Sequence, residues 1–329
     1  MFATIESTAG FALVWQAGLF EVIMCENMDN LIVAMPNGVR IAEMLGKKGS
    51  ENGLAFYNGH GDAKNIVMLA PHSLEEKYYA VPQSLILSDL VVLDTSNLDA
   101  VFGDVVVACS MLGKPVVFTD ANPVDKIIGS LELVHYVKNE SELLQFLLDY
   151  DPRKDNVAEQ EIKVVIDRAF PVKGVGDVAL GIVRSGTIHV HDVLVHNSGK
   201  QVTIRHLQSQ DVDIESAGAG TRIGLAIKGI ESSEIKKGDT LSVKAIAYIK
   251  DFKAELIFNK FAGADAKGVK MHCSAVSDFS DAEATIEPLD GNTYRVSLAK
   301  AMPLDGASKL IFVRDEKPRM FAISASLVL

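Results

Sequence analysis

The spacing of apolar residues changes near residue 150, and this change most limits the folds open to the chain. Before it, short continuous apolar runs alternate with stretches of helical spacing. Continuous apolar runs are typical of strands buried on both faces, and strands separated by helices form βαβ units. We therefore expect a three-layer α/β domain with a mainly parallel sheet over residues 29–150. Its expected strands are 30–35, 65–69, 90–94 and 115–119, and its expected helices are 40–45, 74–87, 99–112 and 140–149.

After residue 150 the helical spacing nearly disappears. The charged, proline-bearing stretch 151–161 is predicted to be a linker. Beyond it, β-branched residues often alternate with polar ones, and glycines recur at short intervals as turns. Many short strands with regular turns form sandwiches or barrels, and we expect two β-barrels, at 162–242 and 243–329. Residues 1–28 are expected to be an N-terminal extension, either an added helix or hairpin or a segment upstream of the real start.

The formal net charge of −11 is confined to the first half of the chain. Residues 1–157 hold 10 Lys and Arg against 21 Asp and Glu, whereas residues 158–242 have a net charge of −1 and residues 243–329 of +1. An acidic chain is unsuited to indiscriminate binding of nucleic acid, because phosphates require a surplus of Lys and Arg, and we expect no DNA partner. The two near-neutral segments remain eligible for RNA.

The three cysteines, Cys25, Cys109 and Cys273, are far apart and outside any C-x-x-C pair, so they predict reduced thiols and no metal site. The apolar stretch 11–24 contains polar residues, lacks a basic flank and is too short to span a bilayer. We therefore expect a cytoplasmic protein that is not attached to a membrane.

Glycine and histidine motifs do not by themselves indicate an enzyme. The G-x-G-x-x-A run at Gly174 precedes β-type sequence where a dinucleotide site needs a helix, so it is interpreted as a hairpin. His189 and His191 share a strand face without a well-placed third metal ligand. The sequence has no G-x-S-x-G, H-E-x-x-H or G-x-x-x-x-G-K-S/T motif, and so no motif predicts a catalytic residue.

Several motifs in residues 164–241 resemble the second domain of the EF-Tu family of translational GTPases, most closely its archaeal SelB-like members. They include D-R-A-F, V-K-G-V-G, A-G-A-G-x-R-x-G-L-A-x-K-G and K-K-G-D. Residues 29–49 and 85–119 resemble the phosphate-loop region and central strands of a SelB-like factor described from methanogens in connection with pyrrolysine decoding. The resemblance implies a P-loop-GTPase-like α/β domain followed by two β-barrels.

The phosphate loop implied by this resemblance is degenerate. In the family, successive backbone N–H groups and one lysine hold the phosphates, and a Ser/Thr hydroxyl holds Mg²⁺. Here Val39 and Arg40 take the positions of that lysine and hydroxyl, Pro36 lacks an N–H, and only Gly38 remains. These replacements predict that phosphate binding is lost.

The metal and guanine motifs are degenerate as well. Leu69 replaces the aspartate that reaches Mg²⁺, and His72 is a weak candidate for a water-positioning histidine. Asp120 and Asn122 belong to a guanine motif that lacks its aspartate. An acidic site would also repel a triphosphate of roughly four negative charges. We predict no GTP binding or hydrolysis, no catalytic residue, and no cofactor or metal; the alternative is an active GTPase with atypical loops, using GTP and Mg²⁺.

The resemblance also implies that the second domain helps to hold the aminoacyl end of a tRNA, and that the barrels contact tRNA and ribosome. Gln208 falls where family members place a side chain against the terminal adenosine, with Arg205, Asp211 and Arg222 nearby. For Arg205 and Arg222 the alternative is a solvated strand charge. For the whole protein a further alternative is a protein-interaction scaffold that has lost RNA binding.

Overall fold

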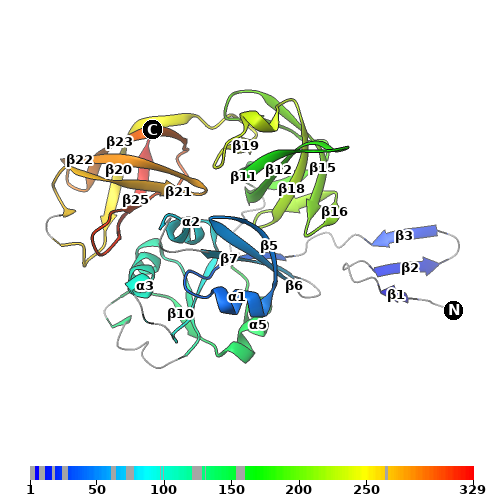
Figure 1. Ribbon diagram of the computed structural model, residues 1–329, viewed down its shortest axis with the longest axis horizontal. Helices are drawn as coiled ribbons and strands as arrows, with labels where there is room; N and C mark the ends of the chain where they lie inside the picture. Colours follow the sequence, from blue (N-terminus) through cyan, green and yellow to red (C-terminus); the bar gives the residue numbers. More distant parts are fainter. Residues whose placement is uncertain are drawn as a thin grey trace.

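Three domains form a triangle in the computed structural model (Figure 1). The α/β domain lies below two β-barrels, which stand side by side above it in this view. This arrangement confirms the expected fold class. The structure describes residues 4–6, 12–16, 19–23, 29–60, 64–71, 78–96, 98, 100–120, 128–129, 131–152, 160–263 and 266–329.

A seven-stranded sheet with helices on its faces makes up the α/β domain. The strands are β4 (Asp29–Ala34), β5 (Lys47–Asn52), β6 (Leu54–His60), β7 (Lys64–Pro71), β8 (Leu90–Leu93), β9 (Val116–Phe118) and β10 (His135–Val137), and the helices are α1 (Val39–Leu45), α2 (Ala80–Leu87), α3 (Ala100–Leu112) and α5 (Glu140–Asp149). The strand order is β10-β9-β8-β4-β7-β6-β5. Strands β10 to β7 in this order run parallel, whereas β6 and β5 are antiparallel.

The first barrel is closed by six strands. Its strands are β11 (Lys163–Val172), β12 (Gly176–Ser185), β14 (Val193–His196), β15 (Gln201–Ser209), β18 (Arg222–Lys228) and β19 (Thr240–Ser242), and smaller elements are β13 (Thr187–His189), β16 (Val212–Ile214), β17 (Ser216–Gly218) and the 3-10 helix η2 (Ser232–Glu234). Pairing of β14 with β15 closes the order β14-β19-β11-β12-β18-β15, and β16 extends β15. Val164, Leu194, Ile204 and Leu225 belong to its apolar interior.

The second barrel also closes with six strands. They are β20 (Tyr248–Phe258), β21 (Met271–Ser277), β22 (Ser280–Asp290), β23 (Thr293–Pro303), β24 (Ile311–Val313) and β25 (Met320–Val328), in the barrel order β20-β23-β22-β21-β24-β25. Residues alternate between buried and exposed along β20, as a barrel strand requires. Phe252, Leu256, Val296 and Phe312 fill the interior.

Within the expected extension 1–28, the described residues are antiparallel strands. They are β1 (Thr4–Glu6), β2 (Ala12–Gln16) and β3 (Leu19–Ile23), which form a sheet of their own in the order β1-β2-β3. The described residues of the expected extension are therefore strands, and none of them is helical.

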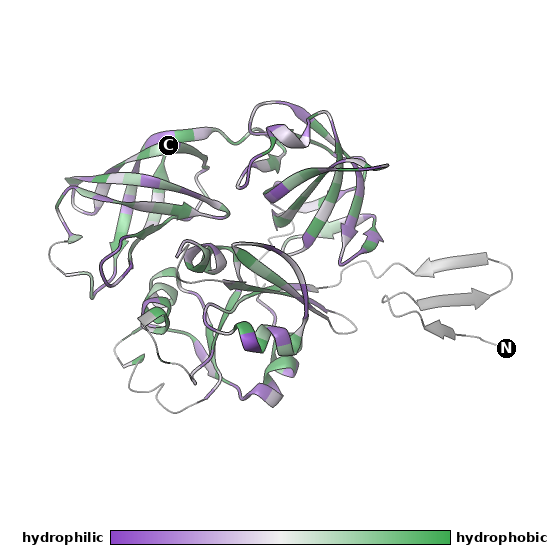
Figure 2. Cartoon of the chain, viewed as in Figure 1, coloured by the Kyte–Doolittle hydropathy of each residue, from purple (hydrophilic) through white to green (hydrophobic). Residues whose placement is uncertain are grey.

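The helix α2 is buried over its whole length, because it lies between the central sheet and the barrels (Figure 1). In Figure 2 the helices α1 and α5 carry both hydrophilic and hydrophobic residues, whereas α2 is largely hydrophobic or neutral. Leu87 of α2 packs in one cluster with Ile182 of the first barrel and Phe279 of the second. Arg184 of β12 donates to the Leu87 carbonyl at 2.8 Å, and its Nε lies 3.3 Å from Asp278 Oδ1. One helix therefore joins the cores of all three domains.

The observed elements differ from the expected ones mainly at one sheet edge. Strands β5 and β6 occupy residues 47–60, where no strand was predicted. The β5 sequence, KKGSEN, has no apolar residue, and pairing with β6 makes it a strand. Helix α2 begins at Ala80, and residues 74–77 of its expected range lie outside the described residues. No helix in the described part of the chain is long and apolar enough to cross a membrane.

Candidate functional site

The turn between β4 and α1 occupies the position of the expected phosphate loop. Met35, Pro36 and Gly38 are buried. The Met35 N–H donates to the Leu69 carbonyl at 2.8 Å, the Gly38 N–H donates to the Met35 carbonyl at 3.2 Å, and proline has no N–H. These three residues therefore offer no unbonded N–H to a phosphate.

The side chain of Asn37 closes the same turn against the end of β8. Its Nδ2 donates to the Asp94 carbonyl at 2.8 Å, and its Oδ1 accepts the Asp94 N–H at 3.0 Å. Asp94 is a buried residue, and its carboxylate lies 3.5 Å from Arg40 Nη2. The strand ends thus present an acidic group beside the turn that takes the position of the expected phosphate loop.

The remaining residues at this edge have structural partners. Arg40, on the first turn of α1, is exposed and hydrogen-bonds Glu140 of α5. This hydrogen bond raises the pKa of Arg40 and lowers that of Glu140. Val39, at the expected lysine position, packs partly buried against the core of the domain. Leu69 is fully buried among apolar residues.

Two candidates near this edge cannot be placed. His72 and Asn122 lie outside the described residues, and Asp120 is exposed after β9. In the part of the chain that the structure describes, no group of three or more His, Cys, Asp or Glu is arranged to hold a metal ion.

The outer face of the first barrel holds the second candidate site. A β-bulge in β15 places both Arg205 and His206 on the outside, because the pairing with β18 skips Arg205. Alternation then resumes, with Leu207 buried and Gln208 exposed. The bulge thereby brings His206 and Gln208 onto one face.

Asp213 of β16 connects these two side chains. Its Oδ1 accepts a hydrogen bond from Gln208 Nε2 at 2.7 Å and lies 2.8 Å from His206 Nε2. The hydrogen bond from Gln208, and after it the one with His206, lowers the pKa of Asp213. Gly224 of β18 pairs with Gln208, and a Cβ there would lie 4.0 Å from the Gln208 Cβ and 3.5 Å from Leu180 Cδ2. Because Gly224 has no side chain, the barrel surface between Gln208 and Leu180 stays open.

Asp211 belongs to the tight turn between β15 and β16. Its φ is +65°, and that of Gln210 is +51°, as a type I′ turn requires. The Gln210 Nε2 reaches Asn65 Oδ1 of the α/β domain at 3.4 Å. The turn therefore lies at the border between the first barrel and the α/β domain.

Arg222 is not part of the exposed face. Its guanidinium lies 3.7 Å from the Phe56 ring centroid, and Nη2 donates to Ser50 Oγ at 3.0 Å and to Asp167 Oδ2 at 2.8 Å. The two ion-paired side chains are 10% and 1% exposed. Burial lowers the pKa of Arg222, and the Asp167 carboxylate opposes that effect. This geometry gives Arg222 a structural contact between the first two domains, which neither alternative from the sequence anticipated.

His206 and Asp213 were not among the site residues expected from the sequence. The bulge at Arg205 and the short β16 pairing create their contact, and neither changes the alternation of residue types that marks a strand. The one signal for this contact in the sequence was an aspartate, Asp213, shortly after a predicted strand end.

Comparisons with known proteins agree with this architecture. Residues 176–242 match the family model described as elongation factor Tu domain 2. An uncharacterized protein of Methanocaldococcus jannaschii is 25% identical over 297 residues, which cover 87% of this chain and 96% of that protein. Elongation factor 1-alpha of Cenarchaeum symbiosum is 30% identical over 202 residues, and the match spans 59% of this chain and 45% of that protein. The selenocysteine-specific elongation factor of Escherichia coli is 38% identical over 92 residues, covering 27% of this chain and 15% of that protein.

A solved structure has the same fold over most of the chain. It is the translation elongation factor SelB of Methanococcus maripaludis in complex with the GTP analogue GppNHp, with a TM-score of 0.75 at 16% identity. The match covers 92% of this chain and 80% of that chain. This likeness shows the shared three-domain fold.

Proposed function

We propose that this chain, which belongs to the EF-Tu/SelB-type family of translational GTPases, is an elongation-factor-like protein that has lost GTP binding and binds aminoacyl-tRNA or the ribosome through its barrels. The sequence matches span 45% of the elongation factor 1-alpha of Cenarchaeum symbiosum and 15% of the selenocysteine-specific elongation factor of Escherichia coli. The proposal includes a cytoplasmic location, where translation factors work.

The loss of nucleotide binding is supported by the turn between β4 and α1. A phosphate needs several backbone N–H groups and a cation directed at one point. In this turn the Met35 and Gly38 N–H groups bond to protein carbonyls, Pro36 has none, and Asn37 is bound to Asp94. The cation on α1, Arg40, is paired with Glu140.

Binding of a tRNA end is supported by the outer face of the first barrel. Gln208 is exposed beside Gly224, inside the segment that matches elongation factor Tu domain 2. An amide side chain held by Asp213 can hydrogen-bond a ribose or base edge, while Leu180 offers an apolar contact. Arg205 and Asp211 remain proposed neighbours of the RNA. The arrangement of Gln208, Gly224 and Asp213 on this face of the first barrel is the main observation that supports the proposal.

A nucleotide titration tests the first half of the proposal. Fluorescent GTP and GDP, each with Mg²⁺, should show no saturable binding at micromolar concentrations, and an elongation factor 1-alpha serves as the positive control. Micromolar affinity would contradict the proposal. If hydrolysis accompanied it and were lost in His72→Ala, the chain would be an active GTPase with atypical loops.

Filter binding with aminoacyl-tRNA and deacylated tRNA tests the second half. Gln208→Ala should weaken binding of aminoacyl-tRNA about three- to tenfold, since one hydrogen bond is lost. Gln145→Ala is the matched control, because Gln145 is an exposed glutamine on α5, away from the first barrel, whose side chain bonds Asp149. Absence of binding to either tRNA and to ribosomes would leave the protein-interaction scaffold as the better description.

A further inference from the structure

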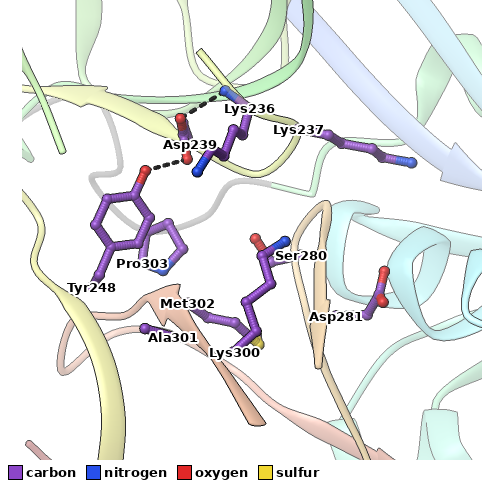
Figure 3. A pocket seen from close by; sticks show the side chains of 10 residues that line it. All are labelled: Lys236, Lys237, Asp239, Tyr248, Ser280, Asp281, Lys300, Ala301, Met302 and Pro303. Atoms are coloured by element: carbon purple, nitrogen blue, oxygen red, sulfur yellow. Dashed lines mark hydrogen bonds between the residues drawn. The ribbon is translucent and has the colours of Figure 1, made fainter. Parts of the chain in front are cut away.

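The K-K-G-D run at residues 236–239 borders a cavity between the two barrels. The cavity has a volume of about 260 Å³. Its walls include Lys236, Lys237 and Asp239 from the first barrel and Tyr248, Ser280 and Lys300 from the second (Figure 3). This volume is close to the lower end of ligand pockets, about 300 Å³. It is large enough for a small anion with an attached group.

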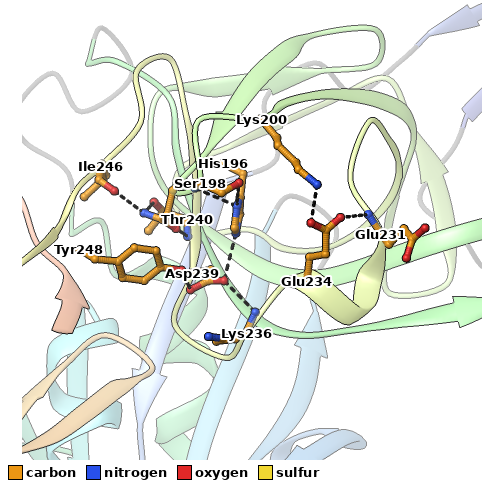
Figure 4. A network of polar contacts seen from close by, with 11 residues as sticks. His196, Ser198, Lys200, Glu231, Glu234, Lys236, Asp239, Thr240, Ile246 and Tyr248 are labelled. Atoms are coloured by element: carbon orange, nitrogen blue, oxygen red, sulfur yellow. Dashed lines mark hydrogen bonds and ion pairs between the residues drawn. The ribbon is translucent and has the colours of Figure 1, made fainter. Parts of the chain in front are cut away.

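Asp239 anchors one wall of the cavity through three hydrogen bonds (Figure 4). Its carboxylate accepts from His196 Nε2 at 3.0 Å, from the Tyr248 hydroxyl at 2.6 Å and from the Lys236 N–H at 2.8 Å. His196 Nδ1 accepts the Ser198 N–H at 3.1 Å, so the ring proton lies on Nε2 and points to Asp239. Although burial alone would raise the pKa of Asp239, these hydrogen bonds hold it below its ordinary value. The Asp239 carboxylate is therefore already hydrogen-bonded by residues of the cavity wall.

Gly238 fixes how closely the two barrels approach. Its φ is +89°, and a Cβ at this position would lie 1.9 Å from Ser280 Oγ and 3.1 Å from the Ser280 nitrogen. No side chain fits in that space, so the loop of one barrel rests directly on the start of β22 in the other. The two walls of the cavity are thus held in a defined relation although they belong to different domains.

The cavity has a local excess of positive charge. Lys236 and Lys300 extend from opposite walls toward the space between them (Figure 3). Neither amine has an ion pair with a carboxylate in the described residues, and Lys237 lies 5.8 Å from the Phe279 ring centroid. Three lysines and two carboxylates line the cavity; Asp239 is hydrogen-bonded by residues of the wall, and Asp281 is exposed, as are Lys236 and Lys300. Two ammonium groups that face one space repel each other unless an anion lies between them.

We propose that this cavity is a binding site for a phosphate group, with Lys236 and Lys300 as the charged ligands and the Ser280 hydroxyl as a further donor. Lysine ammonium groups act as compact point charges and suit a tetrahedral dianion, whereas a planar carboxylate is better matched by the fork of an arginine. The phosphate would come from a small phosphorylated compound or from the terminal phosphate of an RNA. This site lies apart from the tRNA-end face and does not depend on it.

Phosphorus-31 line broadening of inorganic phosphate, titrated with the full chain at low ionic strength, tests the site directly. Lys236→Gln and Lys300→Gln should each weaken phosphate binding about tenfold, because a charge-assisted contact is lost. Lys253→Gln is the matched control, since Lys253 is an exposed lysine on β20 that does not line the cavity. Unchanged circular dichroism and thermal unfolding verify that the variants are folded.

The source of the phosphate is separated with two RNA oligonucleotides that differ only in a 5′-phosphate or 5′-hydroxyl. Preference for the phosphorylated RNA, lost in both cavity variants and kept in Lys253→Gln, supports the site with RNA as its source. Equal binding of the two RNAs together with phosphate binding that needs both lysines supports it with a small compound as the source. Absence of phosphate broadening, or broadening that is the same in Lys236→Gln, Lys300→Gln and wild type, overturns the proposal.

Discussion

Removal of the Arg222 side chain should destabilise the joint between the α/β domain and the first barrel. In Arg222→Ala, the Asp167 carboxylate, which is 1% exposed in the wild-type chain, loses the guanidinium that lies 2.8 Å away. Breaking a buried ion pair by removing one partner costs about 3–5 kcal/mol, because an uncompensated charge remains buried. The lost contact with the Phe56 ring, 3.7 Å from the guanidinium, adds to this loss. We expect a value near the upper end of that range.

Differential scanning calorimetry measures this effect best, since a chain of three domains need not unfold in one step. The transition that includes the joint should move to lower temperature. At about 2–4 °C per kcal/mol for a unit of about 150–250 residues, such as the α/β domain and the first barrel unfolding together, a loss of about 5 kcal/mol corresponds to a shift of roughly 10–20 °C. The other transitions should move less, because their cores do not contain Asp167.

Two variants separate the ion pair from a general effect of arginine removal. Arg205→Ala removes an exposed arginine from the same barrel and should change stability by less than about 0.5 kcal/mol. Asp167→Asn combined with Arg222→Met leaves no charge unpaired and should recover part of the loss. An Arg222→Ala protein within about 1 kcal/mol of wild type, or a double variant no more stable than Arg222→Ala, would refute the reasoning.

Three further predictions concern the second half of the chain and one buried thiol. The folded pKa of Asp239 lies below its ordinary value of 3.8, so the stability that its carboxylate contributes is present above about pH 4 and is lost as the pH falls through the folded pKa. The difference in Tm between wild type and Asp239→Asn should therefore shrink on acidification, and a constant difference would argue against this role of Asp239. Gly238→Ala should lower Tm more than Gly268→Ala, because both glycines have positive φ but only the Cβ at 238 meets another atom, and equal losses would count against this explanation. Burial raises the pKa of Cys109 to about 12, so peptide mapping after alkylation near pH 8 should find it unmodified until urea is added, and rapid labelling of the folded chain would contradict the burial.

The parts of the fold that were predicted well depend on local sequence. The continuous apolar runs at 90–94 and 115–119 became β8 and β9 within one or two residues, because strands buried on both faces need such runs. Helix α5 was predicted with its observed bounds, since Asn139 caps it and Glu140 and Glu142 lie in its first turn. The fold class and the family resemblance, both confirmed, follow from such local patterns and from motifs.

The parts that were missed depend on contacts between distant residues. Arg222 was expected on an exposed face, but Ser50 and Phe56 approach it only after two domains have docked. In the same way, the partnership of His206 with Asp213 exists because a bulge changes the direction of one side chain. A sequence pattern records which face a residue takes within its own strand, and it does not record which other domain covers that face.

The burial of α2 on every side has an evolutionary consequence. The helix as a whole must fit a sheet and two barrels at once, so a substitution that suits one neighbour can disturb another. Asn37 and Arg40, beside the expected phosphate loop, contact Asp94 and Glu140 of the α/β domain itself and can vary more freely. Among relatives of such a protein, the surface around the turn between β4 and α1 should diverge fast, while the eight residues from Ala80 to Leu87 should change only in concert with both barrels.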